Sequence, residues 1–329
     1  MITPVDVVGI GNAIVDVLSL VDDEFLIKNN LTKGNMSLVD ESTSDKFYRQ
    51  LTPLEFSAGG SVANTLFTLS SFGAKSSYIG KIKDDAMGQI FHQDLKNANI
   101  KLGTIPSQNG PSTARCLLFI TPDTKRTMQT YLGAAIDLTV HDVNISQIKD
   151  SKILLVEGYL FDPPHGREAA LKAVKYAKEQ GKKIALIISD HLCIKRHKDI
   201  FSNFIVDYVD YLFLGESEII ELSNEETVEK SIQKIKSICP IVVTSLEEHG
   251  SIISSGEEVI KFSPEKPLRL VDSVGIGSLH TGGFIFGLLN DYNIKQCAKI
   301  AALAVSEGLA TIGSRPKKSL KHLLDFVKA

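Results

Sequence analysis

Val271-Asp272-Ser273-Val274-Gly275-Ile276-Gly277-Ser278 precedes an apolar segment, residues 279–289, whose pattern predicts a helix. Closely spaced glycines let backbone N–H groups converge at a helix N-terminus, where the helix dipole also favours an anion. Phosphate is the natural ligand of such a loop. A Gly-x-Gly pair taken alone is better explained by a tight turn, so the rest of the chain decides its meaning.

Strand-like and helix-like segments alternate through most of the 329 residues. Strands are predicted at 5–10, 76–82, 152–157, 183–188, 208–214 and 240–244, and helices at 61–72, 166–180, 216–222, 227–238, 279–289 and 294–308. Residues 251–262 have a hairpin-like pattern. Alternating units of this kind favour an α/β fold with a mostly parallel central sheet and helices on both faces.

Two stretches depart from the alternation. Residues 17–40 and 105–131 are richer in alternating, β-branched and turn residues, which predicts strands of a small accessory sheet. No repeat or flexible linker divides the chain. We therefore expect a β lid, formed by 17–40 and 105–131, inserted in a core domain formed by 1–16, 41–104 and 132–329.

The composition is that of an ordinary soluble protein, with 43% hydrophobic and 23% charged residues and a net charge of −3. No basic face indicates nucleic-acid binding, and no apolar run approaches the length of a membrane span. The N-terminus has no signal-peptide pattern, so a cytoplasmic location is expected. The four cysteines are widely separated and the histidines are scattered, so we assign no structural metal.

A second glycine-containing motif follows the first predicted strand, at residues 9–16. It superficially matches a dinucleotide-binding fingerprint, but Ile14 occupies the position of the third small residue. A nicotinamide-dependent oxidoreductase is therefore the weakest alternative. Asn12 and Asp16 are better suited to binding hydroxyl groups, although a turn-forming Asn and a helix-starting Asp would give the same pattern.

A third motif, residues 56–65, places paired glycines before Ser61 and Asn64, which lie one helical turn apart. Capping alone would explain this motif in isolation. The three glycine motifs gain significance because they occur together, in this order.

The complete set of motifs resembles one family. The residues that carry the resemblance are Gly11-Asn12 with Asp16, Lys33-Gly34-Asn35-Met36, Gly59-Gly60-Ser61 with Asn64, Gly80-Lys81 with Asp84, Asp85 and Gly88, and Asp272-x-x-Gly275-x-Gly277 with Gly282-Gly283-Phe284. They resemble the ribokinase (PfkB) family over nearly the whole chain. Residues 126–134 and 189–191 are most similar to its adenosine-kinase-like bacterial branch.

The resemblance implies phosphoryl transfer from Mg-ATP to a hydroxyl of a small-molecule sugar or nucleoside. It implies a sugar- or ribose-binding set of Asn12, Asp16, Gly34, Gly59, Gly60, Ser61 and Asn64. For the nucleotide it implies Asp190, Thr244 and Gly250, with Glu218 acting indirectly on magnesium. Gly275, Ile276 and Gly277 would form the anion hole. A monomer and a homodimer formed through the lid are both compatible with the pattern.

Three positions depart from the family pattern, all on the phosphoryl-transfer side. Ser278 stands where the family has the aspartate that accepts the hydroxyl proton, and general-base catalysis contributes ~10²–10⁴-fold in rate. His280 is predicted to point elsewhere on the helix and to be a poor substitute. Gly215 replaces an asparagine near Glu218, and Leu246 replaces a glycine of the nucleotide turn. We therefore expect impaired turnover, or a non-catalytic protein that retains a nucleoside or sugar pocket.

Overall fold

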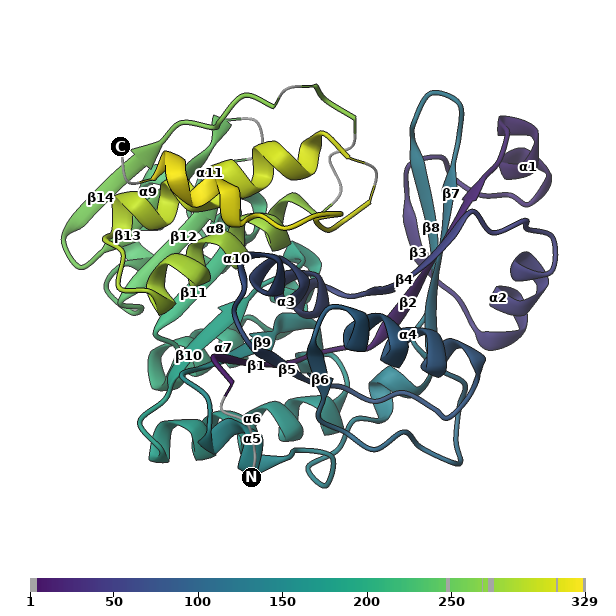
Figure 1. Cartoon of the computed structure of the whole chain (residues 1–329), viewed down its shortest axis with the longest axis horizontal. Helices are drawn as coiled ribbons and strands as arrows, with labels where there is room; N and C mark the ends of the chain where they lie inside the picture. The colour runs from purple at the N-terminus through teal and green to yellow at the C-terminus, as the bar shows by residue number, and fades with distance from the viewer. Residues whose placement is uncertain (1–4, 247–248, 268, 272–274, 312, 328–329) are drawn as a thin grey trace.

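The computed structural model describes residues 5–246, 249–267, 269–271, 275–311 and 313–327. A nine-stranded sheet forms the centre of the molecule (Figure 1). Neighbouring strands pair in parallel except at β12-β13-β14, which pair antiparallel. In spatial order the strands are β14 (Glu258–Phe262), β13 (Ser251–Ser255), β12 (Ile241–Ser245), β11 (Tyr211–Gly215), β10 (Lys183–Ile187), β9 (Ile153–Glu157), β1 (Val7–Ile10), β5 (Ser76–Ile79) and β6 (Ile100–Leu102).

Helices cover both faces of this sheet, which confirms the predicted fold class. Alternate strand residues face opposite layers: Leu155 belongs to one apolar cluster, and Leu154 and Val156 belong to the other. The first layer contains α3 (Ser61–Phe72), α4 (Ala86–Asn97), α10 (Ile276–Leu289), α11 (Ile294–Leu309) and η4 (Lys321–Phe326). The second contains α5 (Ile145–Lys149), η2 (Gly158–Phe161), α6 (Pro164–Glu179), α7 (His191–Tyr208), α8 (Glu216–Ser223) and α9 (Val228–Ile235).

A second sheet of five strands stands beside the core, at the right of Figure 1. Its order is β3 (Met36–Leu38), β8 (Arg126–Tyr131), β7 (Ala114–Ile120), β2 (Ile14–Leu20) and β4 (Glu55–Gly59). Helices α1 (Asp23–Lys28) and α2 (Glu41–Tyr48) pack on one face, where Phe25 and Phe47 contact Phe119. The short η1 (Gly133–Asp137) follows β8. This sheet, which we call the lid, includes residues before 17 and between 41 and 59.

The segment 189–210 differs from the sequence expectation. A strand was predicted from residue 208, but α7 extends through Tyr208 and β11 begins at Tyr211. The helix begins at His191, and the side chain of its N-cap residue Asp190 accepts a hydrogen bond from the Leu192 amide. The predicted strand start was therefore wrong by three residues, because the last turn of α7 occupies positions 208 and before.

Two glycines hold α10 close to its neighbours. A Cβ atom at Gly282 would lie 2.6 Å from the Thr68 side chain of α3, and one at Gly283 would lie 2.8 Å from the Ala301 backbone of α11. Only glycine permits these approaches. The N-terminus of α10, where the glycine loop ends, is thereby fixed against the N-terminus of α3.

Candidate active site

A buried carboxylate, Glu157 at the end of β9, organises the carboxyl edge of the central sheet. Its oxygens accept hydrogen bonds from the Asn12 amide at 2.5 Å, the Ser61 amide at 3.1 Å and the Ser61 hydroxyl at 2.5 Å. Burial raises the pKa of Glu157, and the hydrogen bonds from Ser61, Asn12 and Val62 oppose that rise. The Ser61 hydroxyl also lies 3.1 Å from the Ser189 hydroxyl. Glu157 therefore fixes two predicted site residues that are far apart in sequence.

Two buried amide oxygens face this region without a partner. Asn12 and Asn64 are 4% and 6% exposed, and among the described residues neither Oδ1 atom has a hydrogen-bond partner. A buried polar atom without a partner is costly in free energy and usually marks a binding requirement. Each oxygen can accept a hydrogen bond from a ligand hydroxyl.

The carboxyl group of Asp16 lies at the lid side of the site, on β2. It rests directly against Gly59, where a Cβ atom would come within 2.5 Å of the carboxyl oxygens. Burial raises the pKa of Asp16 to about 7, whereas the positive charges of Arg315 and Arg126 lower it. Gly60 is equally constrained, since its φ is +94° and a Cβ atom would lie 2.6 Å from the Asn12 carbonyl oxygen.

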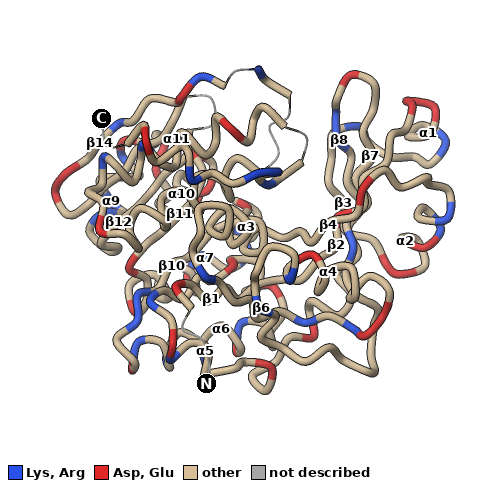
Figure 2. Tube along the Cα trace, viewed as in Figure 1, with Lys and Arg blue, Asp and Glu red and all other residues tan. Residues whose placement is uncertain are grey.

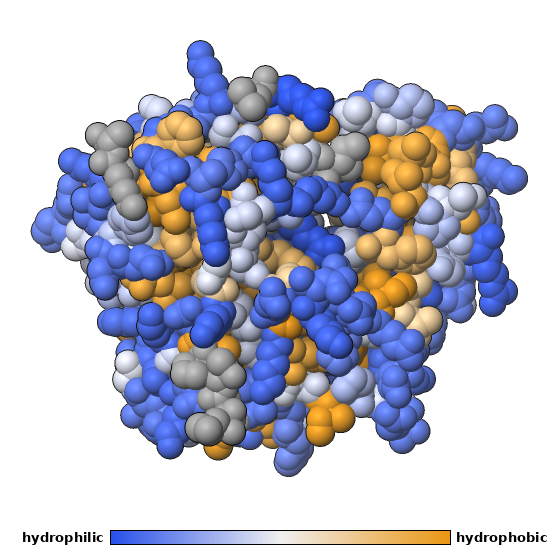
Figure 3. All heavy atoms as spheres, viewed as in Figure 1, coloured by the Kyte–Doolittle hydropathy of each residue, from blue (hydrophilic) through white to orange (hydrophobic). Residues whose placement is uncertain are grey.

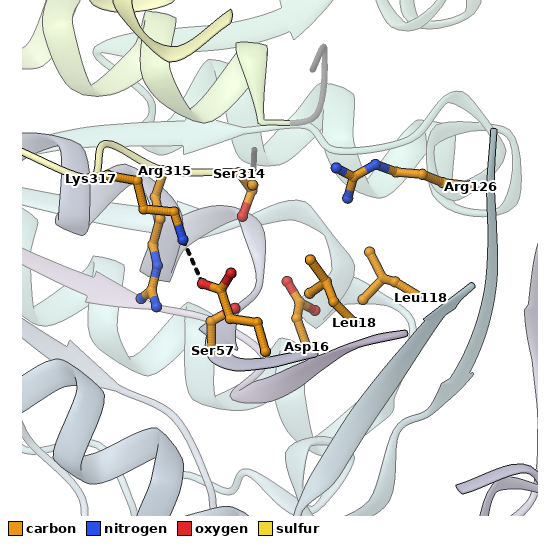
Figure 4. Close-up of a pocket in the computed structure, with 10 residues that line it drawn as sticks. Asp16, Leu18, Ser57, Leu118, Arg126, Ser314, Arg315 and Lys317 are labelled. Carbon is orange, nitrogen blue, oxygen red and sulfur yellow. Dashed lines mark hydrogen bonds and ion pairs between the residues drawn. The ribbon is translucent and has the colours of Figure 1, made fainter. Parts of the chain in front are cut away.

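Asp16 opens into a pocket between the lid and a C-terminal segment, residues 313–317 (Figure 4). In Figure 4 the Ser314 hydroxyl and the Arg126 guanidinium extend toward the space above Asp16. Glu55 and Lys317 form an ion pair at 2.5 Å across one side. The full lining is Asp16, Leu18, Glu55, Ser57, Leu118, Arg126, Gly313, Ser314, Arg315 and Lys317. The pocket combines two carboxylates, three cations and two leucines.

The glycine loop enters α10 beside this pocket. Gly275 has a φ of +82°, and a Cβ atom there would lie 2.3 Å from the Ser314 carbonyl oxygen. Gly277 is exposed, with no atom within 4 Å of its Cβ position, so the first turn of α10 around Gly277 and Ile276 is open to a ligand. The free amides of a helix N-terminus suit an anion. Asp272, Ser273 and Val274 lie outside the described residues.

Ser278 is turned toward the neighbouring helix. It is 8% exposed, and its hydroxyl donates a hydrogen bond of 3.1 Å to the Ser61 carbonyl oxygen. His280 is 7% exposed, and burial lowers its pKa to about 4, which keeps it neutral at physiological pH. The first turn of α10 thus has an open face at Gly277 and a serine hydroxyl, with no carboxylate at position 278.

Two predicted nucleotide-side residues, Asp190 and Glu218, come together at the ends of β10 and β11. The Glu218 carboxyl folds back over Gly215, where a Cβ atom would lie 2.2 Å from one of its oxygens. Burial raises the pKa of Glu218, the Glu218 and Gly215 amides lower it, and the negative charge of Asp190 adds to the rise. The missing side chain at position 215 is what leaves room for this conformation.

The described residues of the predicted nucleotide-binding turn are buried or contact one another. Thr244 is completely buried, and its hydroxyl has no partner among the described residues. Leu246 is 7% exposed, packs into the apolar layer of the second face, and its amide donates to the Gly250 carbonyl oxygen at 2.9 Å. Gly250 has a φ of +91°, with a Cβ position 2.1 Å from the Phe262 carbonyl oxygen. Residues 247 and 248 lie outside the described part.

Gly34 lies apart from these groups, in the lid. Its φ is +83°, nothing lies within 4 Å of its Cβ position, and its amide donates to the Thr127 hydroxyl at 3.0 Å.

Sequence reasoning missed two residues near the site, Glu157 and Tyr159. Burial raises the pKa of Tyr159, and the negative charges of the nearby Asp190 and Glu157 add to the rise. An acid directly after an apolar strand was the available signal for Glu157.

Lys and Arg are interspersed with Asp and Glu along the trace in Figure 2. Within the described ranges no cluster of His, Cys, Asp and Glu has the geometry of a metal site. No described helix combines the length and apolar character needed to cross a membrane.

Comparison with known proteins yields a family and close structural neighbours. The model of the pfkB family carbohydrate kinases matches residues 38–317. A 5-dehydro-2-deoxygluconokinase of Geobacillus thermodenitrificans is 28% identical, covering 75% of this chain and 77% of that protein. Adenosine kinase 2 of Arabidopsis thaliana is 25% identical, with coverages of 90% and 91%.

Two solved structures superpose over almost the full length. A probable sugar kinase from Rhizobium etli has a TM-score of 0.91 and 32% identity, covering 99% of each chain. The adenosine kinase from Sinorhizobium meliloti has a TM-score of 0.91 and 33% identity, covering 98% of this chain and 99% of that one.

Proposed function

This chain belongs to the pfkB family of carbohydrate kinases, and we propose that it is a slow kinase that transfers a phosphoryl group from Mg-ATP to a nucleoside or sugar hydroxyl. The observation that supports the substrate side is the pair of buried, unpartnered amide oxygens of Asn12 and Asn64. The carboxyl group of Asp16 lies against Gly59, and the Asn12 carbonyl oxygen lies against the adjacent Gly60. Three such acceptors match the hydroxyl groups of a ribose or polyol. Gly59, Gly60 and Ser61 would approach the same sugar, and Gly34 would contact it from the lid.

A small apolar cluster in the lid, of which Leu18 and Leu118 line the pocket beside Asp16, favours a nucleoside over a free sugar. Leu18, Cys116 and Leu118 form a small apolar cluster on the face of the lid that also carries Asp16, whose strand neighbour is Cys116. Further apolar side chains are exposed in the region of the second sheet (Figure 3). A base attached to the sugar would pack against Leu18 and Leu118, whereas a free sugar has no apolar group to place there.

The nucleotide half fits Mg-ATP only in part. The open turn at Gly275, Ile276 and Gly277 would bind the transferring phosphoryl group through backbone amides. Asp190 and Glu218 would face the bound nucleotide, and Thr244 and Gly250 would border it; magnesium would neutralise phosphate charge. However, Leu246 is buried and the Glu218 carboxyl folds over Gly215, so this half departs from the family arrangement.

The proton of the attacking hydroxyl has no carboxylate to accept it at position 278. Ser278 commits its own proton to the Ser61 carbonyl oxygen. Losing a general base costs ~10²–10⁴-fold in rate, while positioning and the anion site still contribute. Slow transfer is therefore our first proposal, and a protein that binds a nucleoside or sugar without turnover is the second.

The deciding experiment is ADP release over a panel of nucleosides and sugars, including sugar acids. Wild type is compared with Ser278→Asp and with Ser278→Asn, which matches the size but supplies no base. The kinase proposal expects slow release by wild type, faster release by the Asp variant only, and measurable Mg-ATP affinity by calorimetry. Nucleoside binding without Mg-ATP binding would favour the binding protein. Fast turnover by wild type would contradict the impairment, and turnover restricted to sugars would contradict the nucleoside preference.

A further inference from the structure

We propose that Asp162, which lies outside the residues that face a ligand, is a positioning residue. Its carboxylate fixes the first turns of α7 and so holds Ser189 and Asp190 beside Glu157 and Ser61. Asp162 lies at the C-terminal end of η2, five residues after Glu157. What the positioned groups bind rests on the proposed function, whereas the mechanical role of Asp162 does not.

The Asp162 carboxylate is shared by two consecutive residues of α7. Arg196 donates from Nε and Nη2 at 3.0 and 2.7 Å, and His197 Nε2 lies 2.9 Å from Oδ1. Burial works against ionisation, but the bonds from Arg196 and His197 outweigh it and hold the pKa of Asp162 below its usual value. A bidentate arginine gives geometric as well as energetic specificity.

The helix is broken where these contacts form. His197 has φ −132° and ψ 28°, which are not helical values, inside α7. Neighbouring side chains on a regular helix diverge by about 100°, so a regular helix would direct Arg196 and His197 to different sides. The break removes that obstacle. The contacts of Asp162 therefore form at a kink in α7, which divides the helix into a first segment, 191–196, and a second segment, 198–208.

The first segment reaches the site. The Ser189 hydroxyl lies 3.1 Å from the Ser61 hydroxyl, and the Asp190 side chain caps the segment at the Leu192 amide. Cys193 adds a contact of 3.6 Å from its sulfur to the Gly158 carbonyl oxygen. The contacts of Asp162 with Arg196 and His197 thus join η2, which follows Glu157, to α7, which follows Ser189.

The second segment is anchored by other contacts. The Phe161 ring packs against Phe201 at 4.6 Å and against Phe204 at 4.9 Å between ring centroids. These three side chains are buried. Removing the charge of Asp162 should therefore loosen 191–196 and leave 198–208 packed, a pattern that general destabilisation would not produce.

Amide hydrogen exchange on the full-length protein tests this pattern without any ligand. Asp162→Asn is expected to speed exchange at 191–196 and leave 198–208 unchanged. The matched control is Asp210→Asn, which removes another ion-paired aspartate, bound to Lys183 and the Ile184 amide just beyond the end of α7. Equal exchange at 191–196 in Asp162→Asn and wild type, or a uniform increase along α7, would overturn the proposal.

A double-mutant cycle with adenosine as the calorimetric probe tests the link to the site. Asp162→Asn is expected to weaken binding on the order of tenfold, as small displacements of positioned groups do. Ser189→Ala should then add little in the Asp162→Asn background, because the hydroxyl is already displaced. Fully additive losses would overturn the positioning role. If wild type binds no adenosine, the nucleoside proposal fails while the exchange result still decides the role of Asp162.

Discussion

The Ser278 hydroxyl donates a hydrogen bond to the Ser61 carbonyl oxygen at 3.1 Å, and so joins the N-terminal turns of α10 and α3. Ser61 in turn binds Glu157 through its amide and hydroxyl. A residue at the position of the family's base therefore serves here as a bridge between two helices that border the site. This relationship makes the exchange of Ser278 for a carboxylate more than a gain of a base.

We first predict opposite structural effects for two variants of equal size. Asn at position 278 can donate an N–H to the Ser61 carbonyl oxygen, whereas an ionised Asp would place negative charge against it. Ser278→Asp should therefore be less stable than Ser278→Asn by about 1–2 kcal/mol at pH 7.5. The difference should shrink below pH 4, where the carboxyl is protonated. Urea unfolding at both pH values measures it, and equal stabilities at pH 7.5 would show that a carboxylate at position 278 does not repel the Ser61 carbonyl oxygen.

The second prediction concerns Asp16. Its pKa is raised by burial from the ordinary 3.8 to about 7 in the folded chain, so between these values the folded state holds a proton that the unfolded state has released. Stability should fall as pH rises across this window. Asp16→Asn removes that dependence and should stabilise the unliganded protein at pH 8 but not at pH 3.5. The same variant should lose nucleoside affinity. A lower urea midpoint for Asp16→Asn at pH 8 would show that the carboxylate is not strained.

The third prediction is that the ionisation of His280 changes stability with pH in the direction opposite to that of Asp16. Burial lowers its pKa from 6.5 to about 4, so the unfolded chain binds a proton that the folded chain does not. The stability that His280 contributes as a neutral group is lost as pH falls from 6.5 toward 4, by about 3 kcal/mol in the limit. Urea unfolding of His280→Gln at pH 7.5 and pH 4.5 should show a flatter pH dependence than wild type. If His280→Gln and wild type show the same pH dependence of stability, the imidazole of His280 is ionised or solvated in the folded protein.

Much of the fold could be predicted because its signals are local. Apolar runs ending in glycine or an acid indicated the parallel strands, and the helix predicted at 61–72 has the bounds of α3. The predicted bounds of the lid left out β4 and the start of β2. These two strands pair although the connection between them contains two helices and a further strand. Pairing between strands that are so far apart in sequence produces no local sequence pattern.

The site could be predicted less completely for the same reason. Asn12, Ser61 and Asn64 carry glycine-rich signatures, and the structure brings all three to the carboxyl edge of the central sheet. Glu157 binds two of them but lies 145 residues from Asn12 and 96 from Ser61. Its role depends on the adjacency of β1 and β9, which is a property of the sheet order. The roles of the individual site residues stay predictions.

The last prediction separates Gly60 and Gly277, which we propose border the sugar and the phosphoryl group respectively. Gly60→Ala forces a side chain onto a φ of +94° and brings Cβ within 2.6 Å of the Asn12 carbonyl oxygen. We expect a loss of about 2 kcal/mol or more in unfolding free energy, and a displaced Asn12 that no longer binds nucleoside. Gly277→Ala meets nothing within 4 Å on a helical turn, so its stability should change by no more than about 0.5 kcal/mol.

The functional effect of Gly277→Ala should nevertheless be distinct. A methyl group at the open turn crowds the amides that would receive the phosphoryl group, so Mg-ATP affinity or ADP release should fall while nucleoside affinity stays at the wild-type level. Calorimetry with each ligand separately measures the two halves of the site. Loss of nucleoside binding in Gly277→Ala, or its retention in Gly60→Ala, would mean that the sugar and phosphate positions are assigned to the wrong glycine motifs.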